Sequence, residues 1–238
     1  MGEVIEDGFD FETGSYVTGN PGKGNLSFFP KLFRKYGGLE FTFEKSRGKI
    51  NFFLSYVLSK TYGNYPGLYD ADYNVGNPNI SPIDFVEQTV NATGLLPNDR
   101  PHVLKFFGSY NFNFGLSMGA TFYVMSGTPI NEFGAIPFAA EFKKFLSERG
   151  SVGRTPSIWD GNIRLKYDLG MLTKSNFGAK LIVDIFHLFS PRKAVILDQQ
   201  HFSGADPDGN QIGENPNYLN PLLYQLPMML RVGFEIDF

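Results

Sequence analysis

Apolar and polar side chains alternate one by one along several stretches of the chain. The clearest stretch has apolar residues at alternate positions and charged or amide residues between them. It places Trp159, Gly161, Ile163, Leu165 and Tyr167 on one side and Asp160, Asn162, Arg164, Lys166 and Asp168 on the other. Because successive side chains of a β-strand point to opposite faces, this stretch predicts a strand with one apolar and one charged face.

The same alternation recurs along the rest of the chain. It occupies residues 39–44, 50–58, 104–112, 116–124, 179–185 and 228–238. Near the start, Glu40 and Glu44 alternate with Leu39, Phe41 and Phe43. Several stretches reach about 10 residues, whereas an average soluble strand has about 5–6 and a tilted membrane-crossing strand needs about 9–11. The lengths therefore favour strands that cross a membrane.

Residues 106–131 contain no charged side chain, so a hydropathy window alone would suggest a membrane helix there. However, the stretch holds several glycines, which weaken a helix, and Asn111 and Asn113 would be unpaired in lipid. Alternation with a period of two fits the residues on both sides of 113–115. We therefore predict a β-hairpin with a tight turn at 113–115.

The connections between the predicted strands alternate in length. The short turns are 46–48, 113–115 and 170–176, and the long polar segments are 63–99, 127–157 and 190–223. Outer-membrane barrels have short periplasmic turns and long extracellular loops in this order. The predicted fold is therefore all-β, an antiparallel up-and-down transmembrane barrel to which this chain contributes about seven strands. Residues 1–32 are assigned to the remainder of an extracellular loop, and 33–238 to the C-terminal strands.

Composition narrows the function more than the fold. The 21 basic and 24 acidic residues offer no surface suited to nucleic acid, and the lack of cysteine excludes disulfides and thiolate metal sites. Aromatic residues make up 16% of the chain, which suits transmembrane barrels and also aromatic-rich soluble β-sandwiches. The first residues are acidic and lead into no apolar core, so no signal peptide is recognised. Since bacterial barrels have an even number of strands, we expect the chain to be part of a longer protein.

Five short sequences stand in a characteristic order along the chain. They are 55–60 (SYVLSK), 96–102 (LPNDRPH), 126–129 (SGTP), 153–157 (GRTPS) and 184–189 (DIFHLF), and the chain closes on Phe238. In this order they resemble the C-terminal region of TonB-dependent receptors, in particular the Oar-like branch with an N-terminal carboxypeptidase-regulatory-like domain. The resemblance covers 33–238. It departs at His187, where the family often has Asn, and the chain includes neither a plug domain nor a TonB box.

The resemblance implies a larger barrel, of about 22 strands, in the outer membrane of a Gram-negative bacterium. It implies ligand uptake past a plug on which the periplasmic TonB protein pulls, with no enzymatic activity and no cofactor. The partners would be outer-membrane lipid, an unidentified ligand and TonB, acting through the plug. Phe238, Ile236 and Phe234 resemble the C-terminal signal that the barrel assembly machinery reads.

Two other functions stay open on the sequence. The first is a passive porin or an adhesin-type barrel, which would share the strands but lack a plug and a TonB box. The second is a secreted β-sandwich that binds glycans, which would be soluble without detergent.

The alternation also assigns side chains to the two faces of the barrel wall. The residues expected to face the lumen are Asp160, Arg164, Lys166, Asp168, Glu40 and Glu44. Those expected to face lipid are Trp159, Ile163, Leu165 and Tyr167. The lumen charges either pair with one another or line a pathway.

No catalytic or phosphate-binding motif is recognised in the chain. The histidines, His102, His187 and His201, are too isolated to predict a metal site. Residues 70–76 and 206–210 resemble calcium loops, but Ser81 and Asn217 stand where the bidentate Glu is required. Turn chemistry accounts for both stretches, so we expect no bound metal.

Overall fold

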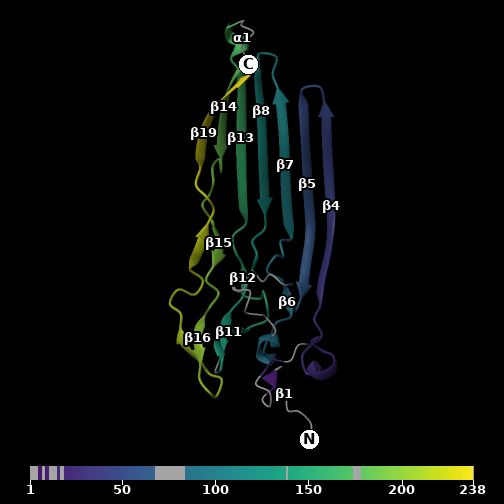
Figure 1. The fold of residues 1–238 in the computed structure, drawn as a ribbon, viewed down its shortest axis with the longest axis vertical. Helices are drawn as coiled ribbons and strands as arrows, with labels where there is room; N and C mark the ends of the chain where they lie inside the picture. The colour runs from purple at the N-terminus through teal and green to yellow at the C-terminus, as the bar shows by residue number, and fades with distance from the viewer. Residues whose placement is uncertain are drawn as a thin grey trace.

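The computed structural model describes residues 5–6, 9–10, 15–16, 19–67, 84–137, 139–173 and 178–237. Within these ranges, one main sheet contains seven long strands in chain order (Figure 1). They are β4 (Arg34–Arg47), β5 (Ile50–Gly63), β7 (His102–Asn111), β8 (Leu116–Met125), β13 (Ile158–Asp168), β14 (Gly178–Phe186) and β19 (Met229–Asp237). Every neighbouring pair is antiparallel. The prediction of an all-β, up-and-down antiparallel sheet is confirmed.

Strand pairing in the main sheet is regular. The paired residues follow one another without a register shift from β4 across to β19. The short β6 (Gly94–Leu95) pairs with the end of β5 beside β7. Because a slip of one residue would exchange the two faces of a strand, this continuous register keeps all the apolar positions on one side.

Short connections join the strands at one end of the sheet. β4 and β5 pair as far as Arg47 and Ile50, which leaves only Gly48 and Lys49 in the turn, so the strands run past the turn expected at 46–48. Gly48 has a positive φ of 61°, a backbone conformation that glycine adopts without strain. The third connection contains the single-turn helix α1 (Gly170–Thr173), which the alternation did not predict.

The three long connections meet at the opposite end of the sheet, where the sequence predicted loops (Figure 1). They contain short elements: the 3₁₀ helix η3 (Val86–Thr89) and the strands β9 (Pro129–Ile130), β10 (Phe133–Ile136), β11 (Ala139–Phe145), β12 (Gly153–Arg154), β15 (Ala194–Leu197), β16 (Phe202–Ala205), β17 (Gln211–Glu214) and β18 (Pro221–Tyr224). These strands form four two-stranded sheets: β9 with β12, β10 with β11, β15 with β18 and β16 with β17. We call these connections together the loop cluster.

Buried apolar residues lie mainly in the loop cluster. Phe133, Phe145 and Ala92 pack together although they come from two different long connections. In contrast, the sheet leaves large apolar side chains uncovered, including Met118 and Phe122 on the central strand β8, which are 38% and 37% exposed. A soluble sheet normally buries its apolar face, whereas here the rest of the described chain leaves it uncovered.

The N-terminal part of the chain has its own small elements. The described residues there form a three-stranded sheet of β1 (Ile5–Glu6), β2 (Phe9–Asp10) and β3 (Ser15–Tyr16), followed by the 3₁₀ helix η1 (Gly24–Leu26). β1 lies at the end of the molecule that carries the loop cluster (Figure 1). Throughout the described ranges, no helix has both the length and the apolar content that a membrane crossing requires.

Candidate functional site

The main sheet has one polar and one apolar face. Directly paired residues share a face, and one such row runs from Glu44 through Phe53, Phe107 and Thr121 to Asn162. This row defines the polar face. The charged residues an even number of positions from the row along their own strand lie on the same side: Glu40, Asp160, Arg164, Lys166 and Asp168. The apolar set lies on the other side: Trp159, Ile163, Leu165 and Tyr167. The structure thus separates the residues expected to face the lumen from those expected to face lipid.

A first ion cluster on the polar face joins three strands. Arg164, Asp184 and Arg231 are directly paired in one row across β13, β14 and β19. Arg164 donates from Nε to Asp184 Oδ1 at 2.6 Å, and Arg231 donates from Nη2 to Oδ2 at 2.7 Å. The Asp184 side chain is 4% exposed, but the two arginine side chains are 55% and 60% exposed. One carboxylate therefore serves two guanidinium groups and leaves one positive charge over.

A second ion cluster repeats this composition closer to the short turns. Lys166 and Lys180 each place Nζ 2.8 Å from a carboxylate oxygen of Glu235. Lys166 bonds both oxygens of that carboxylate, since its Nζ also lies 3.1 Å from Oε1. This cluster also holds two cations for one anion. Within these two clusters four cations meet two carboxylates, while Asp160 and Asp168 lie elsewhere on the polar face of β13.

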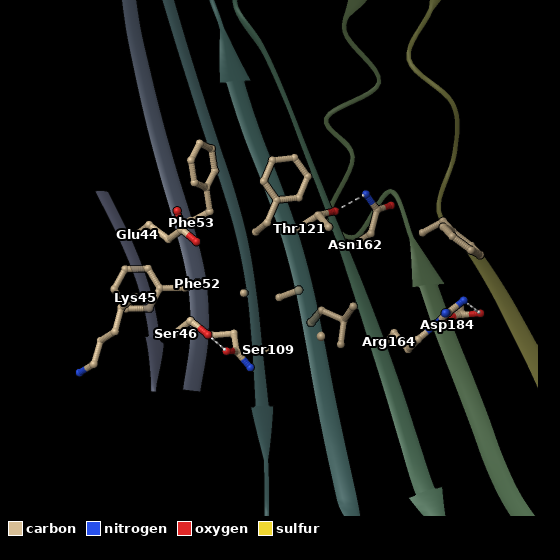
Figure 2. A pocket seen from close by; sticks show the side chains of 17 residues that line it. Glu44, Lys45, Ser46, Phe52, Phe53, Ser109, Thr121, Asn162, Arg164 and Asp184 are labelled. Carbon is tan, nitrogen blue, oxygen red and sulfur yellow. Dashed lines mark hydrogen bonds and ion pairs between the residues drawn. The ribbon is translucent and has the colours of Figure 1, made fainter. Parts of the chain in front are cut away.

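A hollow of about 640 Å³ opens on the polar face beside the first cluster. Phe53 and Phe107, whose ring centroids lie 6.4 Å apart, form an aromatic part of its lining. Asn162 donates from Nδ2 to Thr121 Oγ1 at 3.0 Å, and Figure 2 shows this pair between the aromatic part and Arg164 with Asp184. The hollow thus offers apolar, amide, hydroxyl and guanidinium groups.

Asp160 and Asp168, near the two ends of β13, do not line this hollow. Asp160 is buried, and its Oδ2 lies 2.9 Å from His187 Nδ1. Asp168 accepts a hydrogen bond from the backbone N–H of Gly170 and so caps the turn at α1. Glu40 accepts from the hydroxyl of Ser55. Of the six charges expected at the lumen, Arg164 and Lys166 belong to the ion clusters and Glu44 lines the hollow.

The sequences that carry the family resemblance meet at the base of the loop cluster. Asp99 is fully buried, and its Oδ1 accepts a hydrogen bond from the Thr61 N–H at 2.5 Å. Its other carboxylate oxygen binds Nη2 of Arg154. Arg154 Nη1 also donates to the carbonyl oxygens of Asp99 and Gly127, both at 3.0 Å. Three of the quoted sequences therefore converge on one structural junction rather than on an open site.

Arg100 supports the same junction. Its Nη1 donates to the carbonyl oxygen of Ser126 at the end of β8. Burial of the guanidinium lowers the pKa of Arg100 from its ordinary value. The group stays a donor to the backbone, which suits a structural role for this residue.

Each histidine has a polar partner. Tyr56 Oη lies 2.8 Å from His102 Nδ1 at the start of β7. His201 Nδ1 lies 2.6 Å from Glu132 Oε1, and its ring stacks on Tyr218 at 4.3 Å. Burial, and then the Glu132 charge, raise the pKa of Tyr218. Within the described ranges, no group of three or more His, Cys, Asp or Glu side chains could hold a metal ion.

The calcium-like stretch at 206–210 forms the turn between β16 and β17. Asp206 accepts hydrogen bonds from the backbone N–H and the Nδ2 group of Asn210, at 2.8 and 2.9 Å. These bonds lower the pKa of Asp206. They use the carboxylate oxygens that a calcium ion would need. The other calcium-like stretch, 70–76, lies outside the described residues.

The assembly-signal residues are only partly described. Phe234 and Ile236 lie on β19, where they are 72% and 49% exposed on the apolar face. Phe238 lies outside the described residues. The proposed role of these three residues in assembly remains a prediction.

Sequence reasoning missed the acidic centres of both ion clusters. Alternation placed Asp184, Lys180, Arg231 and Glu235 on polar positions, but nothing in it showed that they would meet Arg164 and Lys166. It also missed the junction of Asp99 with Arg154, since those residues lie 55 positions apart. Their occurrence in the quoted family sequences was the available signal.

Comparison with known proteins supports the fold assignment from a second direction. The chain is 32% identical, over 277 aligned positions, to the TonB-dependent transporter Oar of Myxococcus xanthus. The alignment covers 100% of this chain and 26% of that protein, so the chain spans about a quarter of its relative. No protein-family model and no solved structure matches the chain. Along its whole length the chain is similar to part of this transporter, and its antiparallel sheet of seven long strands is part of a β-barrel.

Proposed function

We propose that this chain forms part of the wall of an outer-membrane transporter that takes up a ligand in a TonB-coupled process. In this proposal the apolar face of the sheet contacts lipid, and the polar face lines the interior. The observation that carries the proposal is the contrast between the faces of the central strands. Met118 and Phe122 are exposed on one face, while the other carries ion pairs and hydroxyl or amide groups along with Phe53 and Phe107.

The spacing of aromatic residues on the apolar face supports the membrane assignment. Trp159 and Tyr167 lie on this face near the two ends of β13. Eight residue steps separate them, about 26 Å along the strand at 3.3 Å per residue and about 20 Å along the membrane normal at a tilt of about 40°. Outer-membrane barrels carry an apolar band about 25 Å tall between two aromatic girdles. The two aromatic residues therefore span most of the height of such a band.

The direction of insertion follows from the connections. Long connections of outer-membrane barrels lie outside the cell, so we assign the loop cluster to the extracellular side and the three short turns to the periplasm. Residues 1–32 then belong to the extracellular side as well. The loop cluster would contribute to ligand selectivity. TonB coupling is inferred from the similarity to the TonB-dependent transporter Oar of Myxococcus xanthus, and it would require a plug in addition to the residues of this chain.

Cysteine labelling on β8 tests the assignment of the faces. Ala120 and Thr121 are neighbours on opposite faces of the central strand, and both are small enough for a cysteine to replace them. We expect a water-soluble thiol reagent to label Thr121→Cys strongly and Ala120→Cys barely, because lipid excludes the charged reagent. Ile163→Cys and Arg164→Cys form a second pair with the same expectation. Strong labelling at 120 with none at 121 would reverse the faces.

Epitope tags test the direction of insertion. A tag inserted beside Asp208, in the turn between β16 and β17, should bind antibody on intact cells. A tag at Gly48 should bind antibody only after the cells are permeabilised, because that turn is assigned to the periplasm. The second tag serves as the matched control. Staining of the Gly48 tag alone on intact cells would show that the topology is inverted.

A further inference from the structure

Acidic and basic side chains are distributed differently between the two faces of the main sheet. The acidic side chains that the structure describes on the seven long strands all lie on the polar face: Glu40, Glu44, Asp160, Asp168, Asp184 and Glu235. Basic side chains occur on both faces, and four of them lie on the apolar face: Lys35, Lys45, Arg47 and Lys60. A face that merely tolerated charge would carry both signs, so the apolar face favours cations.

These four cations all belong to the hairpin of β4 and β5, where they lie at the two ends of its apolar face. Lys35 and Lys60 lie toward the loop cluster, and Lys45 and Arg47 toward the turn at Gly48. Between the two pairs, this face of the hairpin carries glycine and apolar or aromatic residues: Gly37, Leu39, Phe41, Phe43, Phe52, Leu54, Tyr56 and Leu58. Long basic side chains at the ends of such a strip extend toward the headgroup layers of a membrane.

Aromatic rings support the two ammonium groups at the loop-cluster end. Lys35 Nζ lies 5.7 Å from the ring centroid of Phe33, and Lys60 Nζ lies 5.6 Å from that of Tyr62. The two ring centroids are themselves 6.3 Å apart. Since Lys35 pairs directly with Tyr62, the two lysines are diagonal neighbours, about 7–8 Å apart at the backbone. One aromatic pair therefore carries both cations.

The described part of the chain does not neutralise this pair of cations. Both lysine side chains are exposed, and neither forms an ion pair with a described carboxylate. Gly37, which lies directly opposite Lys60, adds no side chain between them. Two like charges at this spacing repel each other, and an anion that contacts both would relieve the repulsion.

The surface beside the lysines indicates which kind of anion fits. Leu39, Phe41 and Leu58 continue the apolar face toward the middle of the hairpin, and they are 61%, 61% and 40% exposed. A small dissolved anion would leave this apolar surface uncovered. A membrane lipid with a net negative headgroup would cover it with acyl chains while its phosphate meets the cations.

We propose that the apolar face of β4 and β5 is a binding site for an anionic membrane lipid. The lipid phosphate contacts the ammonium groups of Lys35 and Lys60, and the acyl chains run along Leu39, Phe41 and Leu58. The lipid belongs to the leaflet on the side of the loop cluster. This inference rests on the proposed function in one respect, namely that the apolar face of the sheet contacts the bilayer.

The test is native mass spectrometry of the purified protein in detergent, titrated with dimyristoyl phosphatidic acid. We expect the protein to retain a tightly bound phosphatidic acid. Dimyristoyl phosphatidylcholine has the same acyl chains but no net charge, so it should bind at least about tenfold more weakly. Glycerol 3-phosphate carries the phosphate without the chains, and it should not displace the lipid at equal concentration.

Variants on the two faces of the sheet identify the site. Lys35→Gln with Lys60→Gln should weaken the tightest binding of phosphatidic acid by about tenfold or more. Lys35→Arg with Lys60→Arg keeps both charges and should restore binding to within about threefold of the unaltered protein. Lys105→Gln removes a cation from the polar face of β7 and should leave binding unchanged. All variants should keep the heat-modifiable gel migration of the unaltered protein.

The proposal is overturned if the Gln double variant retains phosphatidic acid as tightly as the unaltered protein does. Equal retention of phosphatidylcholine overturns it too, because the lysines would then not select a charge. Displacement by glycerol 3-phosphate would show a site for a dissolved anion instead of a lipid. Each of these results can occur while the labelling pattern of β8 stands, whereas a reversed labelling pattern would contradict the proposed function itself.

Discussion

Replacing Asp99 by Ala should open the base of the loop cluster, with a loss of about 3–5 kcal/mol in local stability. The fully buried carboxylate accepts a hydrogen bond from the Thr61 N–H and binds Arg154. Its removal leaves the buried Thr61 N–H and the Nη2 group of Arg154 without an acceptor, while Arg154 Nη1 keeps its bonds to the carbonyl oxygens of Asp99 and Gly127. Amide hydrogen exchange across 126–157 should then speed up by about a hundredfold or more, because exchange there requires the cluster to open.

Two further variants show whether the junction itself carries the effect. Asp208→Ala removes a carboxylate from the exposed turn between β16 and β17. It should change the free energy of opening, as measured by exchange, by less than about 0.5 kcal/mol. Asp99→Asn keeps the shape but weakens the bond to Arg154, so it should fall between the two. Exchange in Asp99→Ala that matches the Asp208→Ala rate would show that Asp99 and Arg154 do not hold the cluster together.

The strands of the main sheet were predictable because each residue in them must lie on either the polar or the apolar face. On β13, a slip of one position would move Arg164 and Lys166 to the apolar side, at about 2–4 kcal/mol for each charge near the middle of a bilayer. Because of this penalty, polar and apolar residues alternate along the sequence with a period of two. The short turns were visible for a related reason, since Gly48 and Gly115 both have positive φ.

The sequence predicted which face each residue lies on, but not which residues pair across neighbouring strands. The alternation puts Asp184 and Arg231 on polar positions, but it contains nothing about how the strands are offset. Their contact depends on the register of β14 with β19, which a separation of 47 positions along the chain does not reveal. The ion clusters are therefore a property of register, and the polar positions alone cannot supply it.

The loop cluster escaped sequence reasoning for a different physical reason. Its strands have two to seven residues, too few for alternation to rise above chance. Its core joins Ala92 to Phe133 and Phe145, which lie far along the chain, beyond the strands β7 and β8. Glycine, proline and asparagine in these connections indicated turns, and the folded contacts between the connections left no local pattern. The single turn of α1 is likewise too short for a helical period.

Replacing Gly127 by Ala should disrupt the same base more severely than most substitutions in the chain. A Cβ atom at this position would lie 1.6 Å from the carbonyl oxygen of Thr155, a backbone atom that no side-chain rotation can move away. The two segments are also bonded to each other, since Thr155 N–H donates to Thr128 O and Thr128 N–H donates to Thr155 Oγ1, both at 2.9 Å. Relief of the clash must break this pairing.

We expect Gly127→Ala to lower the stability of this part of the structure by about 3 kcal/mol or more. This is at the upper end of the cost of inserting a carbon into a closely packed site. Proteolysis of intact cells should then cleave the loop cluster while the strands stay protected, because the clash lies outside the main sheet. Gly37→Ala is the control, as that glycine on β4 has open space and should tolerate a methyl group with little change. Equal resistance of Gly127→Ala and Gly37→Ala to protease would mean that the two segments approach each other less closely than the structure has them. The Gly127 variants therefore test the contact with Thr155, whereas Asp99→Ala tests the Arg154 bonds to the same loop.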